Sequence, residues 1–235
     1  MPFPENEQLT AVILGATGGI GRELGHVLRR SAAIANLVEL SRSTNPSIDY
    51  TRPATLADAA EQVRRQYGEI NILLITTGIL TSTNGAPPEK SFSQLTENAL
   101  TSQFLINATG PALSLQAFLP LMPRTGYCRI GILSARVGSI GDNRLGGWIA
   151  YRAAKAALNQ IIHTAAIELK RTNDQSVCVA LHPGTIETEL SEPYARGRYT
   201  HSPEDCAQNL LNVLGGLSPE QSGGFFDYDA KEIVW

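Results

Sequence analysis

Short apolar runs alternate with longer stretches of helical periodicity along nearly the whole chain. The run at 11–14 is apolar and followed by glycines, as expected for a buried strand. Similar runs recur at 37–40, 48–49, 72–75, 129–133, 177–181 and 223–227. Helical patterns fill the intervals at 19–31, 56–67, 92–107, 111–119 and 148–171, and a last helix opens at 202–205. This alternation predicts an α/β fold, a doubly wound parallel sheet of about seven strands with helices on both faces.

The organisation along the chain favours one domain over residues 1–235. Its 235 residues are 43% hydrophobic, enough for a single well-formed core. The least regular stretches, 81–90 and 187–201, each follow the carboxyl end of a predicted strand, where open α/β sheets bind ligands. We expect 187–201 to form a substrate loop or lid, whereas 81–90 fits an ordinary surface loop equally well.

Charge and apolar length narrow the classes of partner. The formal net charge is -3 with no block of like charges, so we expect no nucleic-acid partner. No apolar run approaches the ~18 residues needed to cross a bilayer. The start, residues 1–7, is polar and acidic, unlike a signal or transit peptide. We therefore expect no membrane association.

Cysteine and histidine usage bears on redox compartment and metal binding. Cys128, Cys178 and Cys206 are widely spaced and odd in number, which favours free thiols in a reducing cytosol over disulfides. The four histidines are scattered without ligand spacing. A cytoplasmic protein with no metal site is the expectation.

A glycine turn lies between the first predicted strand and the first predicted helix. Gly15, Gly19 and Gly21 give the spacing G-x-x-x-G-x-G, which differs from the G-x-G-x-x-G dinucleotide fingerprint. Glycines let the backbone approach a pyrophosphate, and a helix amino terminus adds free N–H donors. A plain tight turn is the alternative, but the strand and helix on either side favour nucleotide binding.

The end of the second predicted strand bears on which nucleotide binds. An acidic residue there contacts the ribose 2′-hydroxyl, whereas an arginine accommodates a 2′-phosphate. Ser41 stands at the acidic position and Arg42 follows it. Arginine pairs bidentately with phosphate, which favours NADP(H) over NAD(H). NAD(H) stays possible, because a one-residue shift in register would bring Glu39 closer to the ribose, and Arg42 can also be a solvated residue.

Tyr151 and Lys155 are spaced to share one face of the long predicted helix. A phenol has an unperturbed pKa of about 10, and a neighbouring ammonium lowers that pKa by favouring the phenolate. The pair can therefore exchange a proton with a carbonyl or an alcohol near neutral pH. Such a pair also occurs by chance on solvated helices, so the catalytic interpretation depends on the glycine turn.

With these motifs in place, the chain resembles the short-chain dehydrogenase/reductase family over nearly its whole length. Within that family it is most similar to the C-factor subgroup, named after a bacterial cell-signalling protein. The subgroup resemblance rests on the stretch 134–143 and on Trp235. The family implies a Rossmann-type fold that binds a nicotinamide dinucleotide, and it says little about substrate.

The resemblance implies roles for residues along the chain. Asp49 matches an aspartate near the adenine, and Asn107 matches an active-site asparagine that would hold a water linked to Lys155. Asn107 can also be a simple helix-breaking residue. The stretch 74–78 stands in place of the family's Asn-Asn-Ala-Gly strand end and keeps only the glycine. The cofactor-binding residues implied are Gly15, Thr17, Gly18, Gly19, Ile20, Gly21, Ser41, Arg42, Asp49, Thr77, Gly78, Lys155, Pro183, Gly184, Thr185, Ile186 and Thr188.

One position departs from the family pattern. The catalytic serine that normally follows the fifth strand would fall at Ala135. Ser134 and Ser139 are the alternatives for supplying the hydroxyl. We favour Ser134 because it keeps the strand-end position, although strand alternation would point it away from Ala135. A purely structural role for Ser134 is equally consistent.

The resemblance implies interconversion of a carbonyl and an alcohol by hydride transfer, with a small-molecule substrate. Tyr151 would be the general acid/base, Lys155 would lower its pKa and hold the nicotinamide ribose, and Ser134 would orient the carbonyl. The alternative is a nucleotide-binding regulatory or signalling protein with little turnover, suggested by Ala135 and by the subgroup. A sugar-nucleotide epimerase is disfavoured, because the chain after Thr188 is too short for a substantial substrate domain.

Two further expectations concern the long helix. Trp148 can line the substrate site or pack under the loop at 144–147. Members of the family pair helices into a homodimer or homotetramer, and we expect one of these assemblies here. The apolar stripe available for such contacts, which can equally face the sheet, comprises Leu158, Ile161, Ile162 and Ala165.

Overall fold

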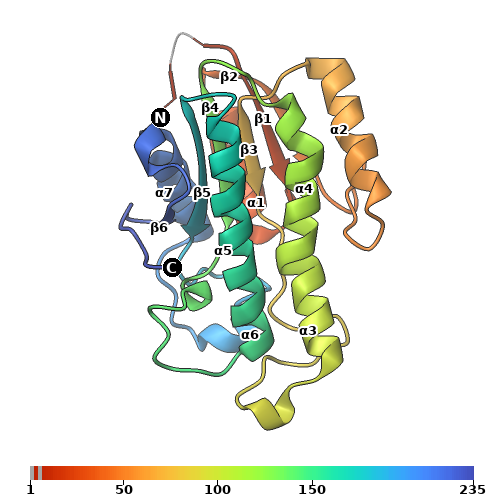
Figure 1. The fold of residues 1–235 in the computed structure, drawn as a ribbon, viewed down its shortest axis with the longest axis vertical. Helices are drawn as coiled ribbons and strands as arrows, with labels where there is room; N and C mark the ends of the chain where they lie inside the picture. The colour runs from red at the N-terminus through yellow and green to blue at the C-terminus, as the bar shows by residue number, and fades with distance from the viewer. Residues whose placement is uncertain (1–2, 5–6) are drawn as a thin grey trace.

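Six parallel strands make up the sheet that this computed structural model shows within the residues it describes, 3–4 and 7–235 (Figure 1). The polar start at 1–7 lies partly outside these described residues. The strand order is β2-β1-β3-β4-β5-β6. The strands are β1 Leu9–Leu14, β2 Ile34–Leu40, β3 Ile72–Ile75, β4 Cys128–Leu133, β5 Ser176–His182 and β6 Phe225–Asp227.

Helices cover both faces of the sheet, which confirms the predicted doubly wound α/β fold (Figure 1). One face packs against α1 and α7 through Leu24 and Leu210, and the other against α2, α4 and α5 through Leu56, Leu115 and Leu158. The α-helices are α1 Gly19–Arg29, α2 Ala54–Tyr67, α3 Glu97–Phe104, α4 Gly110–Phe118, α5 Ile149–Lys170, α6 Glu192–Ala195 and α7 Pro203–Gly216. Short 3₁₀ turns occupy Phe92–Gln94 (η1), Leu119–Leu121 (η3), Arg136–Gly138 (η4) and Pro219–Gln221 (η5).

The strand order places a crevice at one edge of the sheet. From β1 the chain crosses first to β2 on one side and then to β3 on the other. The connections after β1 and β3 therefore leave in opposite directions, which opens a binding crevice at the carboxyl ends of the strands. In Figure 1 this edge faces the end of the molecule that carries α3 and α6.

The strand expected at 48–49 is absent, so the described sheet has six strands rather than about seven. Ile48 and Tyr50 are buried, with the alternation typical of a strand. However, the backbone N–H of Ile48 donates to the Ser41 carbonyl at 2.9 Å, and that of Asp49 donates to Thr55 Oγ1 at 2.9 Å. The apolar pattern therefore indicates burial at this position, but the backbone hydrogen bonds of Ile48 and Asp49 are those of a turn rather than a strand.

The helix expected at 92–107 is interrupted twice. A 3₁₀ turn ends before Leu95, and α3 then begins at Glu97, with the Thr96 side chain accepting from the Ala99 N–H at 3.1 Å. A π-helical segment, Leu105–Thr109 (η2), joins α3 to α4. The continuous helical stretch 97–121 is long and apolar enough to cross a membrane by length and composition alone. Its packing against the sheet is that of a core helix, which passes the same test.

The long helix α5 presents most of its apolar stripe to the sheet. Leu158 and Ile162 are fully buried in the core that covers this face, and Ala165 is nearly so. Ile161 is half-buried. Of the two interpretations of this stripe, the structure therefore favours sheet packing for Leu158 and Ile162.

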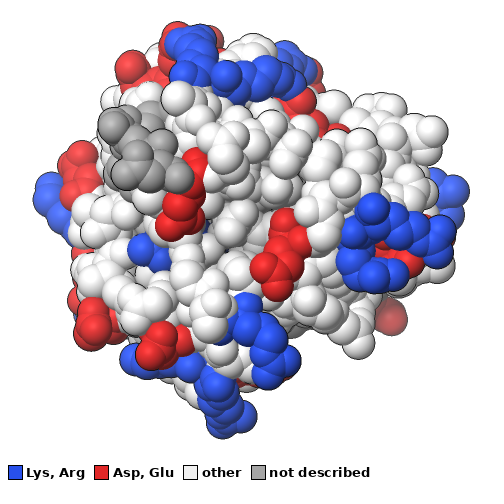
Figure 2. Space-filling model, turned by 90° about the horizontal axis from the view of Figure 1, so that it is seen from above, with Lys and Arg blue, Asp and Glu red and all other residues white. Residues whose placement is uncertain are grey.

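Figure 2 shows the end of the molecule opposite the crevice. Positive and negative side chains lie around its rim, and acidic side chains also lie near its centre. Among the described residues of this end, Lys and Arg lie next to Asp and Glu rather than forming one continuous positive field.

Gly110 allows the first turn of α4 to lie directly on the ring of Tyr50, since a Cβ there would overlap that ring. We expect Gly110→Ala to lower the free energy of unfolding by about 1–3 kcal/mol, because the buried ring must shift. Gly216→Ala is the matched control, since a Cβ there meets nothing within 4 Å. Urea unfolding of both variants tests this, and equal effects at the two glycines would contradict the packing argument.

Candidate active site

The glycine turn brings three segments into close contact. Gly15 adopts a left-handed φ of 92°, and a Cβ there would lie 2.7 Å from Thr76 Oγ1 at the end of β3. A Cβ on Gly21 would overlap the Gly15 carbonyl oxygen, and one on Gly19 would lie 2.6 Å from Thr188 Cγ2. Only glycine fits at these positions, which brings the backbone of the turn close to the surface of the crevice.

The amino terminus of α1 faces a cleft of about 610 Å³, here named the glycine-turn cleft. The first turn of α1 has no acidic residue and no side-chain cap, so its N–H groups are left for an anion. This donor set and the close-packed glycines fit the pyrophosphate of a dinucleotide. The lining residues include Thr17, Gly18, Gly19, Ile20, Gly21, Arg42, Thr77, Gly78, Ser134, Tyr151, Lys155, Pro183 and Thr188.

Several other residues implied for cofactor binding do not line this cleft. Asp49 is tied into a local turn, where hydrogen bonds from Thr51 lower the pKa of its carboxyl. Ser41 is buried and accepts from the Ser43 N–H. Gly184 and Thr185 line the neighbouring pocket instead, and Ile186 is buried in the core.

The second strand ends as the predicted register requires. Leu14 pairs with Leu40, and the Gly15 N–H donates to the Leu40 carbonyl at 2.8 Å, so Ser41 and Arg42 follow directly. The Glu39 carboxylate pairs with Arg29 of α1. This pairing directs Glu39 away from the position an acidic ribose ligand would need, and leaves Arg42 as the strand-end residue in the glycine-turn cleft.

Tyr151 and Lys155 lie in the first two turns of α5, where the helix crosses the end of β4. Both are buried, at 8% and 3% exposed. Lys155 Nζ donates to the Leu133 carbonyl at 2.9 Å and lies 5.9 Å from the centre of the Tyr151 ring. The close approach of Lys155 depends on Gly138, and Gly78 lies within ordinary contact distance of Nζ. A Cβ on Gly138 would lie 2.8 Å from Lys155 Cβ, and one on Gly78 would lie 3.7 Å from Nζ.

The protonation of this pair differs from the expectation. Burial lowers the pKa of Lys155 to about 7 and raises the pKa of Tyr151 above its usual range. The expected lowering of the Tyr151 pKa by Lys155 is therefore not found, because burial penalises the charged form of each group. Tyr151 is held as a neutral phenol, the form that donates a proton.

Asn107 lies in the π-helical segment between α3 and α4, fully buried. Its Oδ1 accepts from the Ile79 N–H at 3.1 Å, and its Nδ2 donates to the Ile79 carbonyl at 2.9 Å and to Gln103 Oε1 at 2.6 Å. A Cβ on Gly78 would lie 3.0 Å from Asn107 Oδ1, so Asn107 and Lys155 approach the same glycine. Single π turns of this kind recur at functional sites.

Both serine alternatives have hydrogen-bond partners within the chain. Ser134 points toward α5, where its Oγ donates to Asn159 Oδ1 at 2.6 Å. Ser139 is buried and its Oγ accepts from the Asp142 N–H at 3.0 Å. Ala135 lines the same pocket as Tyr151. The hydroxyl expected from Ser134 is thus engaged with Asn159, as strand alternation suggested.

A second pocket of about 660 Å³, here named the tyrosine pocket, opens on the other side of Tyr151. Tyr151 lines both spaces. Trp148 lines the tyrosine pocket, with its ring edge-on to Tyr151 at 6.2 Å and to Tyr194 of the lid at 5.8 Å. The lid rests on the 81–90 loop through a 2.6 Å hydrogen bond between Tyr194 and Thr81. Of its two alternatives, Trp148 thus lines a pocket beside Tyr151.

Sequence reasoning missed residues that complete this site. Thr76 lies in the stretch 74–78, and its Oγ1 donates to the Leu14 and Gly15 carbonyls, which holds the glycine turn against β3. Gln103 orients Asn107 from one helical turn earlier, a spacing that could have indicated it. The buried carboxylate of Glu89 accepts from the Ala150 N–H at the start of α5, a contact with no local sequence signal. No cluster of three metal-ligating side chains occurs in the described part of the chain.

The buried Lys155 makes stability depend on pH. Its pKa is about 7 in the folded chain, against about 10.4 for an unfolded lysine. The unfolded chain binds more protons between these values, so stability rises with pH across this window. Relative to Lys155→Met, we expect the wild-type free energy of unfolding to rise by about 2 kcal/mol from about pH 7 to about pH 9. Urea titration measures this, with exposed Lys170→Met as control, and a pH-independent difference would contradict burial of a titrating amine.

Known proteins similar to this chain include proteins named as oxidoreductases and one named C-signal. C-signal of Myxococcus xanthus is 38% identical over 132 residues, covering 56% of this chain and 76% of that protein. A 1-hydroxy-2-glutathionyl-2-methyl-3-butene dehydrogenase of Rhodococcus sp. (strain AD45) is 26% identical over 235 residues, covering 96% and 99%.

Solved structures agree with the fold. The carbonyl reductase Sniffer of D. melanogaster superposes with a TM-score of 0.83 at 22% identity, covering 97% of this chain and 100% of that one. An NADPH-bound carbonyl reductase from chicken fatty liver superposes with a TM-score of 0.81 at 23% identity and the same coverage. At these identities the likeness shows a shared fold alone.

Residues 9–198 match the sequence profile of the short chain dehydrogenase family. This range covers most of the chain and all of the residues that line the two pockets except Pro203. The C-signal resemblance lies within the same family. The chain therefore belongs to the short-chain dehydrogenase/reductase family of NAD(P)-dependent oxidoreductases.

Proposed function

We propose that this protein is an NADP(H)-dependent oxidoreductase that interconverts a small carbonyl compound and its alcohol, with Tyr151 as general acid/base. The observation that carries the proposal is the position of Tyr151 between the glycine-turn cleft and the tyrosine pocket, with Lys155 beside it in the cleft. A bound nicotinamide supplies or accepts the hydride. A substrate in the tyrosine pocket meets that chemistry at the phenol.

The residues of the chain divide the remaining work. Tyr151, neutral because burial raises its pKa, donates its proton to the carbonyl oxygen as charge develops there. After this step the phenolate must regain a proton. Lys155 and Asn107, which both lie beside Gly78, support that reprotonation. The Ser134 hydroxyl is hydrogen-bonded to Asn159. The substrate carbonyl is therefore oriented by other polar groups that line the tyrosine pocket, such as His182. Burial lowers the pKa of His182 to about 4, so its ring is neutral near pH 7 and able to donate one hydrogen bond.

NADP(H) is the cofactor we propose, with NAD(H) as the weaker ligand. Arg42 is the strand-end residue in the glycine-turn cleft, and Glu39 is paired elsewhere. Arg22, whose Nη2 donates to the Thr17 carbonyl, adds a second cation on the same cleft. Two guanidinium groups favour the extra phosphate. NADPH is also the ligand named for the chicken carbonyl reductase.

A second function is supported by Ala135. Without a serine hydroxyl there, the chain could bind the nucleotide as a regulatory or signalling protein with little turnover, and the similarity to C-signal points the same way.

We also propose a cytoplasmic homodimer or homotetramer. The three cysteines are free and buried, which fits a reducing compartment. The shallow groove between α4 and α5 that includes Ile161 offers a subunit contact.

Removing the phenol hydroxyl separates the two functions. We expect Tyr151→Phe to lower kcat/KM for NADPH-dependent carbonyl reduction by about 10²–10⁴-fold, because the developing alkoxide loses its proton donor. NADPH affinity, measured by calorimetry, should stay within about twofold, since the phosphates and adenine are bound elsewhere. Wild-type protein that binds NADPH tightly yet reduces no member of a carbonyl panel would favour the regulatory alternative.

Arg42→Ala tests the cofactor preference. We expect NADPH affinity to fall by about tenfold or more, because a charge-assisted hydrogen bond to the 2′-phosphate is lost, while NADH affinity changes little. The control is Arg124→Ala, an exposed arginine just before β4 begins, at the opposite edge of the sheet. Equal losses for both nucleotides, or a preference for NADH in the wild type, would contradict the 2′-phosphate role.

A further inference from the structure

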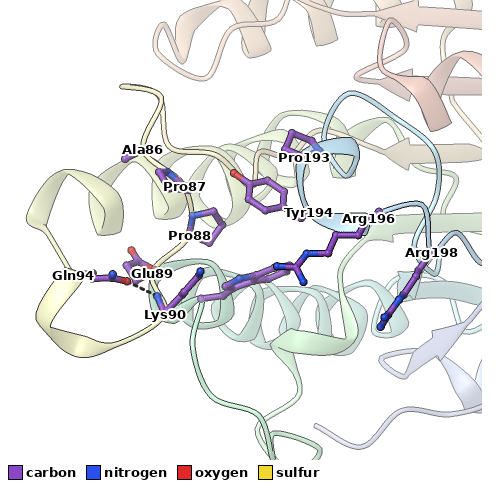
Figure 3. Close-up of a pocket in the computed structure, with 12 residues that line it drawn as sticks. Ala86, Pro87, Pro88, Glu89, Lys90, Gln94, Pro193, Tyr194, Arg196 and Arg198 are labelled. Atoms are coloured by element: carbon purple, nitrogen blue, oxygen red, sulfur yellow. Dashed lines mark hydrogen bonds between the residues drawn. The ribbon is translucent and has the colours of Figure 1, made fainter.

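An outer pocket of about 780 Å³, whose lining residues are drawn in Figure 3, adjoins the tyrosine pocket. It lies between the loop 86–90 and the lid. The two pockets share Trp148, Tyr194, Ala195 and Arg198, so a substrate can occupy both. Tyr151 lines only the inner of the two, which makes the outer pocket a binding space rather than a reacting one.

Cations from two separate segments line the outer pocket. Lys90 comes from the loop, and Arg196 and Arg198 come from the lid. Figure 3 shows the Lys90 and Arg196 side chains directed into the pocket from opposite sides. The ion pairs among residues 3–4 and 7–235 include none of these three. Like charges that face one another across a pocket repel, and an anion between them removes that cost.

The carboxylate that lines the outer pocket is already engaged. Glu89 is 5% exposed, and its Oε2 accepts from the Ala150 N–H at 3.3 Å, where the N-terminal end of the α5 dipole favours a negative charge. The Glu89 carbonyl also accepts from the Trp148 N–H. Glu89 therefore holds the loop against the start of α5 and leaves the three cations to an incoming group.

The backbone of this pocket is held in an uncommon conformation. Trp148 and Arg196 have left-handed φ values of 49° and 51°, two of the three such non-glycine residues among those described. Left-handed backbone is disfavoured for side chains of this size, and such residues cluster at ligand-binding sites. In Trp148 this conformation coincides with ring contacts to both Tyr151 and Tyr194.

We infer that the substrate of the proposed reaction carries an anionic group remote from its reacting carbon, and that Lys90, Arg196 and Arg198 bind this group. The carbonyl or alcohol lies at Tyr151, the linking carbon chain passes along the Trp148 ring, and a carboxylate or phosphate lies in the outer pocket. This inference rests on the proposed function in one respect only, namely that the reacting group at Tyr151 is a carbonyl or an alcohol. The anion site itself follows from the outer pocket.

The test compares two ligands that differ only in charge, 7-oxooctanoate and its neutral amide 7-oxooctanamide. Trp148 reports binding without turnover, because Trp235→Phe leaves it as the single tryptophan of the chain. With saturating NADP⁺, which blocks ketone reduction, we expect the acid to bind about tenfold more tightly than the amide, the effect of one charge-assisted hydrogen bond. Equal dissociation constants for acid and amide would overturn the inference.

Variants locate the effect. Lys90→Gln and Arg196→Gln should each weaken binding of the acid by about three- to tenfold and leave the amide unchanged. Arg171→Gln is the matched control, since Arg171 is exposed directly after the far end of the 22-residue α5. The same loss of acid binding in Arg171→Gln would show that only net charge matters and would overturn the assignment. Adding 7-oxooctyl phosphate as a third ligand distinguishes a carboxylate site from a phosphate site.

Turnover with NADPH separates this inference from the proposed function. A lower KM for the acid than for the amide, lost in Arg196→Gln at unchanged kcat, supports both. If neither ketone is reduced but the acid still binds preferentially, the catalytic proposal fails and the anion site stands. If both are reduced with equal kcat/KM and equal affinity, the oxidoreductase stands and the anion site is overturned.

Discussion

The buried amine of Lys155 connects α5, which carries Tyr151, to the end of β4. Lys155 is 3% exposed, and its Nζ has the Leu133 carbonyl as its protein partner at 2.9 Å. This contact fixes α5 against the end of β4, and Tyr151 is placed one helical turn earlier by the same helix. A Cβ on Gly138 would crowd Lys155 Cβ, and a Cβ on Gly78 would crowd Asn107 Oδ1. Burying a lysine this deeply costs stability, which the packing of the whole α5 face offsets.

That burial also sets the chemistry available to the site. In water, a lysine beside a tyrosine would pull the phenol toward its anion. Here desolvation acts on both groups in opposite senses, and both are driven toward their neutral forms. In the proposed reaction, this arrangement suits proton donation from Tyr151, and the positive charge of an oxidised nicotinamide would stabilise the phenolate in the reverse direction.

Much of the fold could be predicted because parallel strands buried on both faces give continuous apolar runs, as β1 and β5 do. Ile48 and Tyr50 show where that rule fails. They are buried like strand residues, but the neighbouring backbone bonds to Ser41 and to the Thr55 side chain, which no periodicity reports. Likewise, Ser134 and Ala135 line different spaces beside Tyr151, and one sequence could weigh their directions only by strand alternation. Glu89 and the outer pocket depend on contacts across 61 residues and lay beyond local reasoning.

Tyr194 is one point at which residues 187–201 contact the rest of the site. It reaches the 81–90 loop through one hydroxyl pair and touches Trp148 edge-on. A single hydrogen bond of this kind contributes about 1 kcal/mol net, and an aromatic edge contact about the same. Both contributions are small beside the binding free energy of a typical ligand, so a ligand that touched the 81–90 loop and residues 187–201 at once would itself supply much of what holds these two segments together.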